Sequence, residues 1–405
     1  GDALHPDSHY AISCNSRNAF TQVRARWAHL ESQYDALLAA NLHDAFPVDR
    51  QVMFTRCRIW IVYRGYSRSL SEARHLHFGQ SSNGDIEWRF EVAVGGGRCV
   101  CLRISHTLDP ERNAIRINIS RETQAFPGML DDLANVQLIL RPDIEDRSHH
   151  DKTKAFQGAE STWAQSVTLM PSGFSFSPSG QHRLLLQCHQ ATFVNQAEWD
   201  YMVDHPLERE RGLDGATDLF SPGYFEATLQ GGQGLYLDAE TFSDGQQPLP
   251  DDRIAQAPAL PAHQPERVPT KEALLSAMRH YMVQSDGLKT VIAGFPWFLD
   301  WGRDTLICLR GLIAAGWQDD AATILKRFAM YEEQGTLPNI IHGETIGNRD
   351  TSDAPLWFIV VCGELAQTDG NQSILDLDCG NRSLRDVLVS IGENYATGTS
   401  NGIYM

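Results

Sequence analysis

The stretch that decides the fold reads AGFPWFLDWGRDTLICLRGLIAAGW at residues 293–317 and GTLPNIIHGETIGNRDTSDAPLWF at residues 335–358. Each half places aromatic, carboxylate, Arg and Asn residues just before an apolar pattern of helical period. The first cluster contains Trp297, Phe298, Asp300, Trp301, Arg303 and Asp304. The second contains Asn339, His342, Glu344, Asn348, Arg349, Asp350, Asp353 and Trp357. Two such clusters at the mouths of helices predict one shared binding site.

This mixture of side chains suits a sugar. The C–H faces of a pyranose stack on aromatic rings, and its hydroxyl groups need charged or amide partners. Hydrolysis of a glycosidic bond needs two carboxyl groups across one site. A barrel of helices would gather Asp304 and Asp353, because both lie at helix mouths. An Asp at that position is also an ordinary N-cap, but capping does not explain the Trp, Arg, Asn and Glu residues in the same loops.

The two clusters resemble the C-terminal glucosidase domain of glycogen debranching enzymes, the amylo-α-1,6-glucosidase family. The resemblance is carried by WGRDTLICLRGLIAAG (301–316), TLPNIIHGE (336–344) and NRDTSDAPLWF (348–358). It is firm over residues 269–365 and looser over the β-rich region before them. It implies an (α/α)6 barrel and inverting hydrolysis of α-1,6-linked glucose at the branch points of glycogen or limit dextrin.

The resemblance also implies roles for individual residues. Arg303 and Asp304 would hold the glucose unit that is cleaved off, and Asp353 would be the general acid. Asp304 could exchange roles with Asp353, so both are candidate catalytic residues. The candidate substrate-binding residues are Trp297, Asp300, Trp301, Arg303, Asn339, His342, Glu344, Asn348, Asp350 and Trp357. In the family the catalytic base comes from the second half of the barrel, so we expect it beyond Met405 and expect residues 1–405 alone to be inactive.

Length and composition agree with a globular protein. The 405 residues have room for two or three domains, and 42% of them are hydrophobic and 21% charged. A net charge of −17 argues against a nucleic-acid partner and fits a neutral α-glucan. No apolar run reaches the roughly 18 residues of a membrane span, and no signal peptide opens the chain. We therefore expect a cytoplasmic protein with no membrane partner.

No cofactor or metal is expected from the sequence. The eight cysteines are scattered without a CxxC pair, which is typical of reduced thiols rather than of a disulfide framework. His149-His150-Asp151 has no second cluster at ligand spacing, so we interpret it as a solvated loop. The chain begins with Gly and ends at Met405 in a poor place for a domain boundary, so we expect a fragment.

Four parts are predicted along the chain. Residues 1–45 are expected to be a polar tail and a packing helix, because apolar residues recur at three- and four-residue steps from Phe20 to Ala40. Residues 46–244 alternate apolar and polar positions, which predicts an antiparallel β-sandwich. Residues 245–269 contain six prolines and are expected to be a semi-rigid linker. Residues 270–405 are expected to be the N-terminal part of the helical barrel.

Some details stay open at this level. Gly95-Gly96-Gly97 lies between two predicted strands, so a turn is favoured over a phosphate-binding loop. Trp163, Trp199 and Tyr201 would pack in the core or contact a glucan. Two other functions remain possible for the whole chain: another (α/α)6 α-glucosidase, of glucoamylase or trehalase type, or a glucan-binding module without catalysis.

Overall fold

The computed structural model describes residues 9–42, 50–81, 83–243, 245, 269–285, 288–342, 345–368 and 372–404. These residues divide into two compact units. We call the part up to residue 245 the β unit and the part from residue 269 the helical unit. The predicted linker at 245–269 lies outside the described residues, apart from its two end positions.

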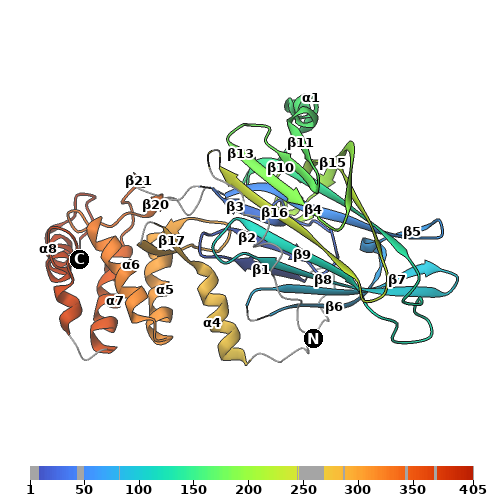
Figure 1. Cartoon of the computed structure of the whole chain (residues 1–405). Coiled ribbons are helices and arrows are strands. Elements are labelled where there is room, and N and C mark those ends of the chain that lie inside the picture. The colour runs from blue at the N-terminus through green and yellow to red at the C-terminus, as the bar shows by residue number, and fades with distance from the viewer. Residues whose placement is uncertain are drawn as a thin grey trace. The chain divides into compact units, whose positions relative to one another are not determined.

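The β unit contains two antiparallel sheets, each of eight strands among the described residues (Figure 1). The first sheet consists of β1 (Tyr10–Cys14), β2 (Phe20–Arg24), β3 (Ala36–Asn41), β4 (Arg50–Tyr63), β5 (Tyr66–Ser69), β10 (Val136–Ser148), β14 (Thr192–Asp204) and β15 (Ala216–Leu229). The second consists of β6 (Arg74–Gln80), β7 (Ile86–Gly95), β8 (Arg98–Leu108), β9 (Ala114–Arg121), β11 (Val167–Met170), β12 (Gly173–Phe176), β13 (His182–Gln187) and β16 (Gly234–Ser243). Buried residues of both sheets form one core.

Strand β7 shows how the sequence sets this packing. Every second residue from Ile86 to Val94 is buried, and the residues between them are more exposed. Trp88 lies opposite Ile104 of β8, which lies opposite Ile119 of β9, so apolar side chains line up across the strands on one face. The alternation predicted from the sequence is confirmed for this strand.

The turn predicted at Gly95-Gly96-Gly97 is also confirmed. It joins β7 to β8, and the three φ angles are 88°, 58° and 70°. Side chains with a Cβ rarely adopt three consecutive positive φ angles. Glycine is needed here for the backbone to reverse, and a strand rather than a helix follows it.

The predicted N-terminal tail and helix are wrong. Residues Tyr10–Cys14, within the expected tail, form β1, and Phe20–Ala40 contributes β2 and most of β3 to the same sheet as β4. The apolar spacing that imitates a helix comes from two strands and the loop between them. All five residues of β2 are buried, including Thr21, Gln22 and Arg24. A surface helix would have exposed those polar side chains.

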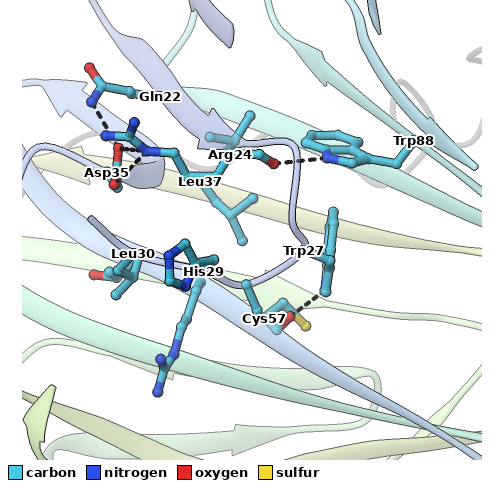
Figure 2. A pocket seen from close by; sticks show the side chains of 13 residues that line it. Gln22, Arg24, Trp27, His29, Leu30, Asp35, Leu37, Cys57 and Trp88 are labelled. Atoms are coloured by element: carbon cyan, nitrogen blue, oxygen red, sulfur yellow. Dashed lines mark hydrogen bonds and ion pairs between the residues drawn. The ribbon is translucent and has the colours of Figure 1, made fainter. Parts of the chain in front are cut away.

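Hydrogen bonds to residues farther along the chain allow these polar side chains to be buried (Figure 2). Gln22 and Arg24 both donate hydrogen bonds to the Asp35 carboxylate, at 2.8 Å and 2.9–3.0 Å. Trp27 donates to the carbonyl of Cys57, and the Trp88 indole donates to the carbonyl of Arg24. The cavity among these side chains measures about 20 Å³, enough for one water molecule but not for a sugar. This region therefore belongs to the packing of the β unit.

Aromatic packing continues towards strand β14. Trp163 is only 8% exposed and stacks on Trp199 with ring centroids 5.4 Å apart, so the core interpretation is confirmed for Trp163. Tyr201 is 51% exposed, and its hydroxyl donates to Glu160. Short helical segments also occur in the structure: η2 (Leu70–Glu72), η3 (Ala155–Gln157), α1 (Ala159–Thr162), η4 (Trp163–Ser166), α2 (Pro206–Glu210) and, in the helical unit, η5 (Gln372–Asp376).

The helical unit has its own core and is built around five longer helices within its described residues (Figure 1). They are α4 (Thr270–Tyr281), α5 (Gly302–Ala314), α6 (Gln318–Met330), α7 (Ala354–Thr368) and α8 (Leu384–Thr397). Strands β17 (Met282–Ser285) and β18 (Leu288–Val291) form a hairpin. A small sheet joins β19 (Asp300–Trp301), β20 (Ile340–His342) and β21 (Thr345–Ile346).

The helices follow from the apolar spacing of the sequence. On α5 the residues Leu306, Leu309, Leu312 and Ile313 are buried, and Gly316 follows the helix with φ 85°. Helix α8 begins at a reciprocal pair of hydrogen bonds between Ser383 and Asp386. The predicted helices are confirmed, while their closure into an (α/α)6 barrel stays a prediction. Across the described residues, none of the helices is both long and apolar enough to span a bilayer.

Candidate active site

The small sheet brings the two motif clusters together. Asp300 of β19 lies opposite Ile341 of β20, and Trp301 lies opposite Ile340. The amide of Gly302 donates to the carbonyl of Asn339 at 3.0 Å, which extends the pairing into the first turn of α5. Backbone hydrogen bonds therefore fix the WGRD segment against the PNIIH segment, although about 40 residues of chain separate them.

Gly302 allows this close approach. A Cβ at this position would lie 2.7 Å from the carbonyl oxygen of Pro338. Cβ atoms do not approach a backbone oxygen so closely, so any other residue would push the two segments apart. The glycine of the WGRD motif therefore serves the geometry of the site rather than helix formation.

Arg303 and Asp353 form the central contact of the site. Nε of Arg303 lies 2.6 Å from Oδ2 of Asp353, and Nη2 donates to Oδ1 at 3.0 Å. Arg303 is in the first turn of α5, and Asp353 immediately precedes α7, which packs against α5. The Arg303 side chain is 55% exposed and that of Asp353 is 36% exposed. A solute can therefore reach this ion pair.

The surroundings of Asp353 favour its ionised form. Partial burial raises the pKa of Asp353, but hydrogen bonds from Arg303 and Thr351 and the charge of Arg303 outweigh burial and hold the pKa below its usual range. Thr351 is 5% exposed, and its hydroxyl donates to Oδ1 of Asp353 at 2.8 Å. In this state Asp353 is a proton acceptor.

Residues of α8 and the segment after it hold the loop that carries Asp353. The hydroxyl of buried Tyr395 donates to the carbonyl of Ser352 at 2.6 Å, and Asn401 donates to the carbonyl of Arg349 at 2.6 Å. Sequence reasoning missed Thr351, Tyr395 and Asn401 as parts of this site. Thr351 lies inside the second motif, two residues before Asp353, whereas the contacts of Tyr395 and Asn401 cross 43 and 52 residues of chain and left no local signal.

Asp304 and two tryptophans lie close to the ion pair in the chain. Asp304 is exposed in the first turn of α5, and its charge acts on Arg303. Trp301 is half-buried at the N-cap of α5. Trp357 is half-buried in the first turn of α7, and the guanidinium of Arg310 lies over its ring, 5.9 Å from the centroid. Aromatic and charged groups thus surround the α5 and α7 N-termini.

Asp300 differs from the other candidates because it is buried, with 1% exposure. Its carboxylate accepts hydrogen bonds from Thr290 and Thr305 and lies 3.4 Å from Arg327. Burial raises the pKa of Asp300, and the charge of Arg327 and the threonine hydroxyls oppose that rise. Protein groups occupy this carboxylate, so its arrangement fits a support for β19 rather than a sugar contact.

The remaining candidates are placed with less detail. Trp297 and Asn339 are half-buried, and Asn348 and Asp350 are exposed. The backbone N–H of Asn339 donates to the backbone carbonyl of Asn348 at 2.8 Å, so this hydrogen bond joins the two ends of the segment 339–348. The side chain of His342 and the whole of Glu344 lie outside the described residues. Within the described part of the chain, no group of three or more His, Cys, Asp or Glu residues is placed to hold a metal ion.

Comparisons with solved structures concern the fold of this chain. A solved structure of a bacterial glucoamylase complexed with acarbose aligns with 96% of this chain and 58% of its own, with a TM-score of 0.50 and 10% identity. That likeness concerns the fold alone, and this chain spans less than two thirds of that protein. A polysaccharide lyase aligns with 59% of this chain and 33% of its own at 9% identity, with a TM-score of 0.27, too low to inform the fold.

Family comparisons cover both units. No curated protein sequence matches the chain significantly. The family described as "Glycogen debranching enzyme N terminal" matches residues 15–236, and the family described as "Amylo-alpha-1,6-glucosidase" matches residues 273–405. The first match spans more than half of the chain, and the second contains every candidate site residue. This chain belongs to the glycogen debranching enzyme family.

Proposed function

We propose that the protein is a glycoside hydrolase that removes α-1,6-linked glucose from the branch points of glycogen or limit dextrin, with inversion. The observation that carries this proposal is the ion pair between Arg303 and Asp353, which joins one residue from each motif at the mouths of α5 and α7. The description of the family that matches residues 273–405 supports the α-1,6 linkage. The glucoamylase-like fold agrees with an α-glucan as substrate.

The chemistry assigns different tasks to the residues around this pair. Arg303 and Asp304 offer charged hydrogen-bond partners to glucose hydroxyls. The half-buried rings of Trp297, Trp301 and Trp357 offer apolar surface for the sugar faces. The remaining candidates, Asn339, His342, Glu344, Asn348 and Asp350, are proposed to bind neighbouring hydroxyls. Asp300 is proposed to support β19.

Asp353 is proposed to donate a proton to the leaving glycosidic oxygen. In an inverting reaction, a second carboxylate activates water on the opposite face of the sugar, about 6.5–9.5 Å from the acid. We assign that base to a residue outside the two motifs, because Asp304 shares the first turn of α5 with Arg303 and suits the binding of hydroxyl groups.

Glucose release from a branched limit dextrin tests the proposal. The intact protein is expected to release glucose from α-1,6 stubs faster than from maltose or trehalose, and the first product is expected to be β-glucose by proton NMR. Asp353→Asn is expected to lower kcat by about 10²–10⁴-fold, because general acid catalysis contributes that much. Dextrin binding should persist in this variant, because the side chain keeps its shape.

Asp319→Asn is the matched control, because Asp319 is an exposed aspartate in the first turn of α6 and belongs to neither motif. Its kcat should equal that of the wild type. Preference for maltose or trehalose would indicate a glucoamylase-like or trehalase-like enzyme instead. Dextrin binding without glucose release by the wild type would indicate a binding module. Loss of turnover in Asp304→Asn with normal turnover in Asp353→Asn would exchange the two roles.

A further inference from the structure

The ion pair in the candidate active site presents a chemical conflict. A general acid must hold a proton when the glycosidic oxygen leaves. Asp353 instead accepts from two nitrogens of Arg303 and from the hydroxyl of Thr351. The N-terminus of α7, which begins at Ala354, also favours a negative charge at Asp353. Without a ligand, this geometry keeps the proton off Asp353.

The groups that face Asp353 differ in how firmly they are held. Thr351 is buried on the same loop, and Tyr395 of α8 is buried and holds the carbonyl of Ser352. Burial raises the pKa of Tyr395, and the charge of Asp353 raises it further, so Tyr395 keeps its proton at neutral pH. Arg303 is the charged partner, and more than half of its side chain is exposed. Arg303 is therefore the partner of Asp353 that can leave without disturbing the core.

We infer that Arg303 exchanges partners when an α-1,6-linked glucoside binds: its guanidinium moves from Asp353 to hydroxyl groups of the sugar, and Asp353 then takes up the proton it donates. This inference rests on the proposed function and makes Arg303 the residue that couples substrate binding to the protonation of the acid. The bound sugar also covers Asp353 and removes water from its carboxyl group, which favours the neutral form. Tyr395 and Thr351 keep the loop in place while Arg303 moves.

The exchange balances with water as the co-reactant: the base takes a proton from the water that attacks the anomeric carbon and later returns that proton to solvent. One proton passes from solvent to Asp353 as the sugar enters, and the same proton passes to the leaving oxygen when the glycosidic bond breaks. The carboxylate that remains regains Arg303 as its partner when glucose departs. The enzyme is then ready for the next substrate.

Infrared difference spectroscopy of the intact protein tests the exchange without turnover. A thio-linked isomaltose, which the enzyme cleaves slowly or not at all, is added to the wild type. The carbonyl band of a protonated carboxyl group is expected to appear on binding, and Asp353→Asn is expected to lack it. In Arg303→Met without sugar the band should appear at a higher pH than in the wild type, because no guanidinium holds the carboxylate. Absence of the band in the wild type at saturating sugar would overturn the inference.

The pH dependence of turnover gives an independent readout. The profile of kcat/KM reports groups of the free enzyme, and that of kcat reports groups of the complex. For the wild type, the fall of activity with rising pH should occur at least one pH unit lower in kcat/KM than in kcat. The separation should be smaller in Arg303→Met, where only the loss of water on sugar binding remains, whereas Arg303→Lys should keep it because it keeps the charge. Coincident profiles in the wild type would refute the exchange.

These outcomes separate the exchange from the proposed function. If Asp353→Asn releases glucose normally, the assignment of the acid fails. If Asp353→Asn is inactive but the wild type shows neither the carboxyl band nor the separation of profiles, the assignment stands and the exchange alone fails.

Discussion

Glu145 in the β unit and Asp353 in the helical unit each bind an arginine, but their surroundings differ. Glu145 is fully buried, lies 2.8 Å from Arg147, and accepts hydrogen bonds from Thr55, Thr153 and Thr217. Burial raises the pKa of Glu145, yet Arg147 and the threonines lower it by more. Asp353 has fewer donors, and both members of its pair are partly exposed.

The difference shows what solvent access does to an ion pair. Around Glu145 the donors are all buried protein groups, so losing Arg147 would leave an uncompensated charge inside the β unit. Around Asp353, water or a sugar hydroxyl can replace Arg303 at little cost, because exposed pairs contribute only about 0–1 kcal/mol. The buried pair of Glu145 and Arg147 is suited to stability. The exposed pair of Asp353 and Arg303 is suited to an exchange of partners during the proposed reaction.

The largest expected effect comes from breaking the buried pair. Glu145→Gln leaves Arg147 charged and buried, so we expect the free energy of unfolding of the β unit to fall by about 3–5 kcal/mol. Urea unfolding followed by tryptophan fluorescence measures this change. Glu364→Gln is the matched control, because Glu364 pairs with Arg310 while the two side chains are 33% and 49% exposed. That variant should lose less than about 1 kcal/mol, and equal losses in both variants would contradict the comparison.

Two buried histidines sharpen the comparison through pH. One of them, His149, is 2% exposed, so the interpretation of His149-His150-Asp151 as a solvated loop is wrong for this residue. Burial lowers the pKa of His106 to about 4, and burial with the nearby charges of Arg50, His150 and Arg147 lowers that of His149 to about 2. Below the ordinary histidine pKa of about 6.5 the unfolded chain therefore binds more protons than the folded chain. Stability should fall as the pH drops from 6.5 to 4, by up to about 1.4 kcal/mol per pH unit for each histidine.

Urea unfolding at several pH values between 7.5 and 4 measures this slope. Among the described residues neither ring nitrogen of His149 has a hydrogen-bond partner, so His149→Phe should remove its share of the slope. His29→Phe is the control, because that side chain is 32% exposed. An unchanged slope in His149→Phe would show that His149 does not stay neutral in the folded protein.

The smallest expected effect concerns the support of Asp353. Tyr395→Phe removes one hydrogen bond to the carbonyl of Ser352, worth about 1 kcal/mol of stability. We expect kcat to fall several-fold with KM nearly unchanged, because the loop shifts while the sugar contacts remain. Tyr404→Phe, at a residue 76% exposed, is the control. A rise in KM at constant kcat would mean that Tyr395 supports binding rather than the position of the acid.

Local patterns predicted much of the fold. The alternation from Ile86 to Val94 and the spacing of Leu306, Leu309 and Leu312 correspond to a buried strand face and a buried helix face. The pattern failed from Phe20 to Ala40, because it counts apolar residues only. There the strand is decided by the burial of Gln22 and its bond to Asp35, a partner that no local rule identifies.

The sequence predicted which residues belong to the candidate site, but not which of them contact each other. The motifs supplied Arg303, Asp304 and Asp353, while the ion pair between Arg303 and Asp353 crosses 50 residues of chain. The sequence also could not separate Asp300 from Asp304, which lie four residues apart. Asp300 is buried and accepts hydrogen bonds from Thr290 and Thr305, whereas Asp304 is exposed. The two differ because the chain passes from β19 into α5 between them.

The pairing of β19 with β20 has a consequence for how the site can diversify. Main-chain hydrogen bonds between Gly302 and Asn339, and between Asn339 and Asn348, set the spacing of the two motifs without involving any side chain. Substitutions at exposed positions such as Asn348 or Asp350 leave that framework intact. If the proposed function holds, we expect related enzymes to differ in oligosaccharide preference through exposed side chains of this segment, while the main-chain hydrogen bonds that set the spacing of the two motifs stay the same.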